Sequence, residues 1–270
     1  MIFRDRVIMR RVLPGISLVC AGAALTIYIV KQDSAKPEPP VSRAVGTELQ
    51  RAPFAAGANP PLISATVTNH SGAESGEDRV VALVTEGNQL LARKDYAEAV
   101  HKFEQAVTIE PGDEDLHYNL AIALAKLGKT EEAKKHYAEA LQIFPDHGEA
   151  RNNLGNLLMK ENKLNEAIDQ FREAVRIVPG NASFHNNLGT AFGRQGNVAE
   201  AIKEFSEAVK LTPVYVEARV NLANASLTAG QVGEAVTQLN EALRLQPDFP
   251  PAIQAMRRAR QIQSAGGVPK

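Results

Sequence analysis

The chain has 270 residues, of which 44% are hydrophobic and 23% are charged, and its formal net charge is −1. This near-neutral balance argues against a strongly basic nucleic-acid-binding protein, so we expect no nucleic-acid partner. With a single cysteine, Cys20, the chain can form neither an internal disulfide nor a cysteine-based metal cage.

The first 30 residues have the pattern of a membrane anchor. Residues 1–11 contain four arginines and one acidic residue, and residues 12–30 form a run of 19 uncharged residues. At about 1.5 Å per residue this run is just long enough to cross a bilayer, and arginines before it are typical of a cytoplasmic end. We therefore predict a basic segment at 1–11 and a signal-anchor helix at 12–30. The rest of the chain then lies on the far side of the membrane, which is extracytoplasmic (periplasmic in a bacterium).

A cleaved signal peptide is the alternative, with Ala21-Gly22-Ala23 as the cleavage site. We favour the anchor because apolar residues continue for seven positions beyond that site. Residues 31–79 are rich in proline, alanine, serine and glycine and have no sustained period, which predicts a disordered linker.

From Val80 onward the sequence repeats every 34 residues. Five prolines stand at this interval, and columns of alanine and of large apolar residues keep the same spacing. The prolines are Pro111, Pro145, Pro179, Pro213 and Pro247, the alanine columns begin at Ala99 and Ala106, and the large residues are Phe103, Tyr137, Phe171, Phe205 and Leu239. Each 34-residue row holds two apolar stripes of helical spacing with a polar break between them, which predicts one pair of helices per row.

Residues at the breaks fit helix ends. Left-handed helix ends are expected at Gly128, Asn162, Gly196 and Gly230, and helix N-caps at Asp95 and Asn197. The proline that ends each row cannot continue a helix. We predict helices at 80–93, 96–109, 114–127, 130–143, 148–161, 164–177, 182–195, 198–211, 216–229 and 232–245, and a last helix after Pro250-Pro251 up to about Gln263. One pair cannot bury its own apolar face, whereas stacked pairs can.

These columns, together with the pairs Leu120-Ala121, Leu154-Gly155, Leu188-Gly189 and Leu222-Ala223, resemble the tetratricopeptide repeat family. The pattern departs from the family at Glu86-Gly87 in the first row and at Ser226 and Leu239 in the fifth. The resemblance implies an all-α fold, a right-handed α-solenoid of five helix–turn–helix repeats at 80–113, 114–147, 148–181, 182–215 and 216–249. A capping helix at 250–264 and a tail at 265–270 would follow.

In this family the first helix of each repeat lines a concave groove that binds peptide segments of other proteins. The sixth residue of rows two to five is asparagine here, and an asparagine can donate to and accept from a peptide unit at once. Similarity to the asparagine ladders of superhelical members predicts a groove with an amide-lined floor and a basic edge. Its residues would be Asn88, Asn119, Asn153, Asn156, Asn187, Asn221 and Asn224, with Lys126, Lys160 and Arg194 at the edge. Packing between helices is the alternative explanation of these asparagines.

Three other features accompany the groove. Asp115, Glu149 and Glu217 make its other edge acidic, and Gly193 is expected to face inward, whereas Gly189 serves helix packing. In the first row Val81, Val84 and Leu91 stand where later rows are polar. They predict an apolar patch for self-association or for docking of Leu62-Ile63 of the linker, unless the first helix needs extra burial at the end of the stack.

No motif indicates catalysis, a cofactor or a metal centre. Gly128-Lys129-Thr130 imitates the end of a phosphate-binding loop, but Ala123 stands where the leading glycine belongs. We therefore predict a non-enzymatic, membrane-anchored scaffold whose groove binds a peptide segment of a partner protein for complex assembly. The alternative is a permanent accessory subunit of an envelope enzyme or of a secretion or biogenesis machine.

Overall fold

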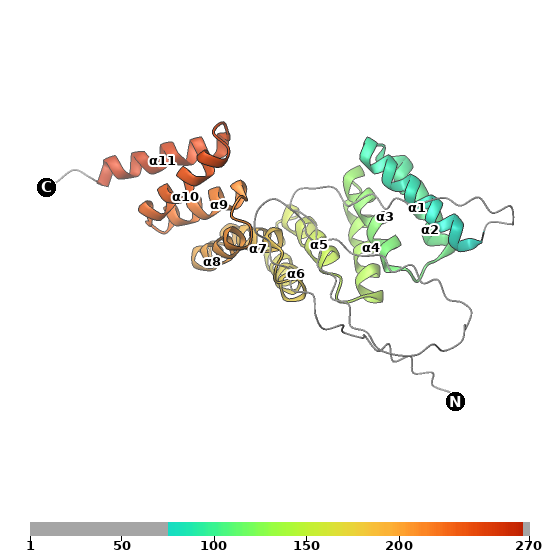
Figure 1. The fold of residues 1–270 in the computed structure, drawn as a ribbon. Coiled ribbons are helices and arrows are strands. Elements are labelled where there is room, and N and C mark those ends of the chain that lie inside the picture. Colours follow the sequence, from blue (N-terminus) through green and yellow to red (C-terminus); the bar gives the residue numbers. More distant parts are fainter. Residues whose placement is uncertain (1–74, 267–270) are drawn as a thin grey trace, which may run out of the picture. The chain divides into compact units, whose positions relative to one another are not determined.

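The computed structural model describes residues 75–266, and within this range the chain forms α-helices joined by short turns, with no strand (Figure 1). The helices are α1 (Gly76–Arg93), α2 (Tyr96–Ile109), α3 (Glu114–Leu127), α4 (Thr130–Ile143), α5 (Gly148–Lys160), α6 (Leu164–Ile177), α7 (Ala182–Gln195), α8 (Val198–Leu211), α9 (Val216–Thr228), α10 (Val232–Leu245) and α11 (Pro250–Gly266). Helices α1 to α10 follow one another as antiparallel pairs, and α11 comes last. The predicted all-helical solenoid is confirmed for this part of the chain.

Most predicted helix ends agree with the structure, but α1 begins four residues earlier than expected. Ser75 and Asp78 form a capping box, in which the Ser75 hydroxyl accepts from the Asp78 amide at 3.1 Å and the Asp78 carboxylate accepts from the Ser75 amide at 3.3 Å. The prediction that the linker extends to residue 79 is therefore wrong for residues 76–79. The last helix also continues to Gly266, past the predicted end at 264.

The predicted anchor at 12–30 and the linker up to residue 74 lie outside the described residues. Between residues 75 and 266, no helix is both long enough and apolar enough to span a membrane.

The turns inside the pairs use left-handed residues as predicted. Their φ angles are 88° at Gly128, 61° at Asn162, 88° at Gly196 and 76° at Gly230. In the first pair Lys94 takes this place with φ 67°, which the sequence did not single out. Asn197 caps α8 by accepting from the Glu200 amide at 3.4 Å, whereas Asp95 makes no side-chain cap bond, so the prediction is wrong for Asp95.

Within a pair, the helices come close where a large side chain of the second helix meets a small residue of the first. In three pairs the small residue is a glycine, and a Cβ there would stand 2.7–2.8 Å from an aromatic ring. These contacts are Gly87–Phe103, Gly155–Phe171 and Gly189–Phe205. The first row therefore keeps the small residue of the pattern at Gly87, and only Glu86 departs from it, pairing with Lys102 at 2.6 Å.

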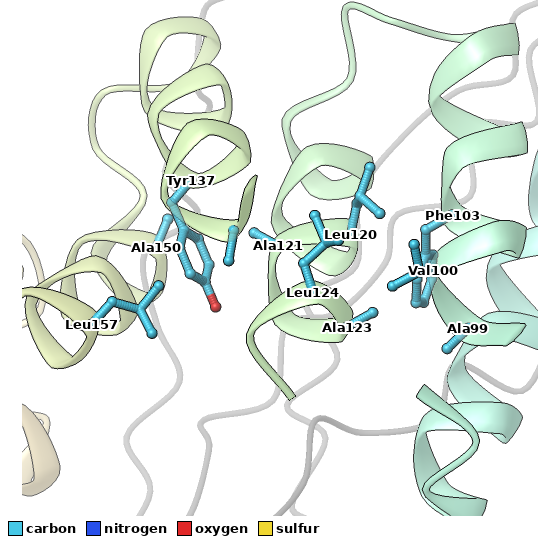
Figure 2. Close-up of a cluster of buried hydrophobic side chains, with 11 residues drawn as sticks. Ala99, Val100, Phe103, Leu120, Ala121, Ala123, Leu124, Tyr137, Ala150 and Leu157 are labelled. Carbon is cyan, nitrogen blue, oxygen red and sulfur yellow. The ribbon is translucent and has the colours of Figure 1, made fainter. Parts of the chain in front are cut away.

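Successive pairs share a continuous apolar core. Each second helix packs against the first helix of the next pair. Figure 2 shows one part of this core, where Phe103 of α2, Leu124 of α3 and Tyr137 of α4 belong to one buried cluster that continues to Leu157 of α5. The alternation of helices along the sequence thus also sets their order in space.

Helix α11 packs on α9 and α10 and ends the stack of described helices. It buries Met256 and Ala259, while Ile262 is 36% exposed. In the 34-residue alignment Arg257 falls in the column of small residues and Arg260 in the column of Leu124, and both arginines are exposed. At these two positions α11 therefore lacks the small and apolar residues against which the second helix packs in the other pairs.

A column of histidines and arginines links the second to fifth pairs to the turn that precedes each of them. The fourth residue of rows two to five donates to the carbonyl oxygen of the preceding proline at 2.9–3.1 Å. The same side chain bonds a residue 19 positions later, on the second helix of its own pair. The bridges run from Pro111 through His117 to His136, from Pro145 through Arg151 to Gln170, from Pro179 through His185 to Glu204, and from Pro213 through Arg219 to Gln238.

The two partners of His185 favour the protonated form of its ring. Its Nε2 lies 3.0 Å from the carbonyl oxygen of Pro179 and its Nδ1 lies 2.7 Å from Glu204, and both of these partners only accept. A neutral imidazole has one N–H and can donate to only one of them. The Glu204 carboxylate accordingly raises the pKa of His185, and this effect exceeds that of burial, which opposes the charge.

Two alanine substitutions in α7 test the close approach of paired helices. A Cβ at Gly189 would stand 2.8 Å from the Phe205 ring and 3.2 Å from the Ala201 carbonyl oxygen, whereas at Gly193 the nearest atom is 3.9 Å away. We expect Gly189→Ala to lower the free energy of unfolding by about 1–3 kcal/mol through overpacking. Gly193→Ala should raise it by up to about 1 kcal/mol through helix propensity. Urea unfolding followed by circular dichroism measures both, and a Gly189→Ala variant as stable as Gly193→Ala would contradict the packing argument.

Substitution of His185 by arginine tests its protonation. Because its pKa is raised in the folded state, the stabilisation from His185 is complete below the unfolded-state pKa of about 6.5 and is lost as pH rises through the folded-state pKa. Arg151 and Arg219 make the same bridge with a guanidinium group. We therefore expect the free energy of unfolding to fall less between about pH 6 and about pH 9 in His185→Arg than in the wild type. Equal pH dependence of the two urea midpoints would show that His185 does not titrate in this range.

Candidate functional site

The odd-numbered helices form the inner layer of the stack. Among the described helices, α5 contacts α7, α7 contacts α9, and α9 contacts α11, whereas the even-numbered helices make no comparable contacts with one another. From α5 to α11 the odd-numbered helices therefore lie closer together than the even-numbered ones, and the bond from Asn153 to Tyr118 joins α5 to α3. We call the surface formed by α3, α5, α7 and α9 the A-helix face, and the predicted asparagines of rows two to five lie on these helices.

Three asparagines of the sixth column link neighbouring odd-numbered helices. Each donates its Nδ2–H to a side chain of the previous row, at 2.9–3.3 Å. The three bonds run from Asn153 to Tyr118, from Asn187 to Asn152, and from Asn221 to Asn186. Asn152 and Asn186 are 8% exposed, so these bonds satisfy buried oxygens. Packing between helices thus accounts for one of the two amide hydrogens of Asn153, of Asn187 and of Asn221.

Other amide groups of these residues are not used by the bonds between rows. Asn187 and Asn221 each keep one N–H and the carbonyl oxygen, whereas the Asn153 side chain also has a hydrogen bond with the Tyr137 hydroxyl. The side chains of four other predicted residues form no hydrogen bond within the described part of the chain: Asn88, Asn119, Asn156 and Asn224. In Asn119 this follows from the previous row, where Val84 has no polar atom to offer. All of these asparagines are half-buried.

The predicted basic edge divides into two kinds of residue. Lys126 and Lys160 are exposed and form no ion pair within residues 75–266. Arg194 instead donates to the carbonyl oxygen of Met159 at 2.8 Å and to Asn162 Oδ1 at 3.1 Å. It therefore caps the end of α5, which partly removes its donors from ligand binding.

The acidic edge includes a histidine that sequence reasoning missed. His147 lies between two carboxylates, with Nε2 3.7 Å from Asp115 and Nδ1 3.4 Å from Glu149. Burial of the ring opposes its charge, but the carboxylates outweigh burial and raise the pKa of His147 to about 9. Nδ1 is also 3.4 Å from the Ala150 amide, and only a neutral ring can accept a hydrogen bond from that amide. Because the pKa of His147 is raised to about 9, the charged ring paired with the carboxylates is the main form at neutral pH. His147 thus offsets part of the negative charge of this edge.

The apolar patch predicted in the first row is smaller than expected. Val81 is 50% exposed, but Val84 and Leu91 are half-buried and pack against the core shared by α2, α3 and α4. The prediction of an exposed patch is therefore wrong for Val84 and Leu91, whose side chains provide burial at the end of the stack.

The A-helix face is hollowed between α7 and α9. The pocket there has a volume of about 280 Å³, and its lining includes Gly193, Asn221 and Asn224. Gly193 therefore faces inward, in agreement with the sequence.

Comparison with known proteins identifies the repeats. Sequence profiles of one family, described as tetratricopeptide repeat, match residues 90–138, 118–182 and 186–250, which is more than half of the chain. No curated protein matches the sequence.

Several solved structures are similar in fold. MamA from Desulfovibrio magneticus RS-1 is 21% identical over 64% of this chain and 98% of its own, with a TM-score of 0.58. PilF from Pseudomonas aeruginosa is 18% identical over 70% of this chain and 86% of its own, with a TM-score of 0.64. YrrB, described as a protein of this repeat type with an unusual peptide-binding site, is 19% identical over 66% of this chain and 92% of its own, with a TM-score of 0.56.

A double substitution tests the role of the asparagine column in stability. Asn187→Ala with Asn221→Ala removes two bonds between rows and leaves the buried oxygens of Asn152 and Asn186 without these donors. We expect a loss of about 1–3 kcal/mol for each in the free energy of unfolding. The control is Asn156→Ala with Asn224→Ala, which removes the same chemical groups where no such bond exists. If urea unfolding shows equal losses for both double variants, the bonds between rows do not stabilise the stack.

Proposed function

Because this chain belongs to the tetratricopeptide repeat family, we propose that it is a non-enzymatic scaffold whose A-helix face binds an extended peptide segment of another protein. The observation that carries the proposal is the asparagine column with its bonds between rows. Asn187 and Asn221 each use one N–H for the stack and keep an N–H and a carbonyl oxygen. A peptide backbone offers the complementary pair at every residue.

Pre-organisation strengthens this reading of the column. An asparagine that is already held by its neighbour loses little rotamer freedom when a ligand binds, and each side chain immobilised on binding otherwise costs about 0.5–1.5 kcal/mol. The bonds that join the rows therefore also prepare the amides for a ligand. Contacts to the backbone alone demand little of the partner's sequence, so its selection depends on the charged edges and on side-chain pockets.

We further propose five repeats, at 80–113, 114–147, 148–181, 182–215 and 216–249, on a chain anchored in a membrane through residues 12–30. The arginines before this run favour a cytoplasmic N-terminus with the repeats on the far side. An anchored scaffold would collect its partner at the membrane surface.

Substitution of two unbonded asparagines tests binding without disturbing the stack. The tagged full-length protein is recovered from detergent-solubilised membranes of its native host, and co-purifying proteins are quantified by mass spectrometry. We expect Asn119→Ala with Asn156→Ala to reduce a specific partner at least fivefold, on the order of one lost backbone contact. Thermal unfolding should be unchanged, because neither side chain makes a hydrogen bond within the described part of the chain.

The control variant is Gln142→Ala with Asn240→Ala, two exposed amides on the second helices α4 and α10. It should retain the partner. If both double variants retain it equally, the A-helix face is not the binding surface. A partner that stays bound to all variants through high salt favours the permanent-subunit alternative, and a protein found only in the soluble fraction would exclude the anchor.

A further inference from the structure

The pocket between α7 and α9 receives a residue from α11. Arg258 lies in the same column of the 34-residue alignment as Asn224, and both line the pocket. Helix α11 therefore extends the A-helix face by one more first helix. The lining contains two arginines, Arg194 and Arg258, and no acidic residue.

The donors of Arg258 and Asn224 are not used by the fold. Arg258 is exposed, and neither side chain forms a hydrogen bond or ion pair within the described part of the chain. Arg194 spends two donors on the end of α5 but keeps its positive charge. The lining of the pocket thus carries two positive charges, those of Arg194 and Arg258. The guanidinium of Arg258 and the amide of Asn224 have no partner within the described part of the chain.

The base of the pocket is apolar and shallow. Gly193 leaves it open because it has no Cβ, and Phe205 and Ala201 lie among its lining residues with at most 5% exposure. The volume of about 280 Å³ is at the lower limit for sites that enclose a whole small molecule, which span about 300–1,000 Å³. The pocket therefore suits one side chain with a short apolar stem and a polar end.

We propose that this pocket, hereafter the Arg258 pocket, receives the carboxylate of an internal glutamate or aspartate side chain of the bound peptide. Arg258 forms the ion pair with the carboxylate, Asn224 donates a second hydrogen bond, and the stem of the side chain covers Gly193. This inference rests on the proposed function and names the residue type that the scaffold selects in its partner. Planar guanidinium groups suit carboxylates because they offer parallel N–H donors.

An internal acid fits the lining of the pocket better than a free C-terminus. A side-chain carboxylate is joined to the backbone by an apolar stem, and the pocket has an apolar base formed by Gly193, Ala201 and Phe205. A C-terminal carboxylate is attached to the backbone directly and has no stem to cover this base.

A peptide selection tests the assignment on the full-length protein. The probe is a library of random dodecapeptides displayed at the N-terminus of a phage coat protein, so that no peptide has a free C-terminus. We expect one position of the selected peptides to be enriched in glutamate or aspartate. Selection on Arg258→Gln should lose this enrichment, and Arg257→Gln should keep it, because Arg257 carries the same charge on the same helix outside the pocket.

Synthetic peptides then measure the pairing. Replacing the selected acid by its amide should weaken binding about tenfold or more to the wild type and to Arg257→Gln, as expected for a hydrogen-bonded charge. The same replacement in the peptide should change binding to Arg258→Gln less than twofold. A double-mutant cycle then gives the coupling free energy between Arg258 and the acid of the peptide. Gly193→Leu, which fills the pocket, should abolish the acid preference.

The outcomes separate this inference from the proposed function. Peptides that are selected without an acid preference, or with a preference that Arg258→Gln retains, overturn the assignment and leave peptide binding intact. Binding that requires a free C-terminal carboxylate on the synthetic peptides contradicts the proposal that the acid is an internal side chain. A selection that enriches no peptide at all overturns the proposed function together with the pocket.

Discussion

The missing side chain of a glycine sets the distance between paired helices. In three pairs an aromatic ring of the second helix lies so close to the first that a Cβ would reach within 2.8 Å of it. A glycine within a helix costs about 1 kcal/mol relative to alanine, but burial of a large apolar side chain contributes about 1.5–3 kcal/mol. A small residue stands in this column every 34 residues, as glycine in three pairs and as Ala121 and Ala223 in the other two. Successive pairs therefore have similar geometry, and side chains in one column meet a similar environment in each row. The asparagine column and the bridges to the proline turns both depend on this regularity.

Features that depend on a few adjacent residues were predictable from the sequence. A left-handed glycine, a proline stop and a helical stripe each act locally, so Gly128, Gly196 and most helix ends were found correctly. The prediction of a helix cap at Asp95 was wrong because a suitable residue type at a suitable position does not ensure that the side chain accepts the cap bond. The start of α1 was predicted wrongly because the 34-residue alignment begins at Val80, whereas the capping residues Ser75 and Asp78 lie before it.

Contacts between rows could not be derived in the same way. The bond from Asn187 to Asn152 spans 35 residues, one more than the repeat, and it requires knowledge of how successive first helices are offset. A signal for the turn bridges was present, since His185 and Arg219 share a column and each has a polar residue 19 positions later. Its meaning depends on the proline carbonyl, whose direction a sequence does not show. The position of His147 between two carboxylates and the contribution of Arg258 to a pocket on α7 and α9 are likewise visible only in three dimensions.

Helix α11 covers the last described pair of helices, and its exposed face affects what can pack there. Arrays of this kind grow by adding identical units, and an uncovered last pair would offer another copy an apolar surface of the same shape as the internal ones. Arg257 and Arg260 occupy the two columns where such an addition requires small or apolar residues, and burying these unpartnered charges would be strongly unfavourable. Stacking of a second copy on α11 in the manner of the internal pairs would therefore have to bury two charged arginines.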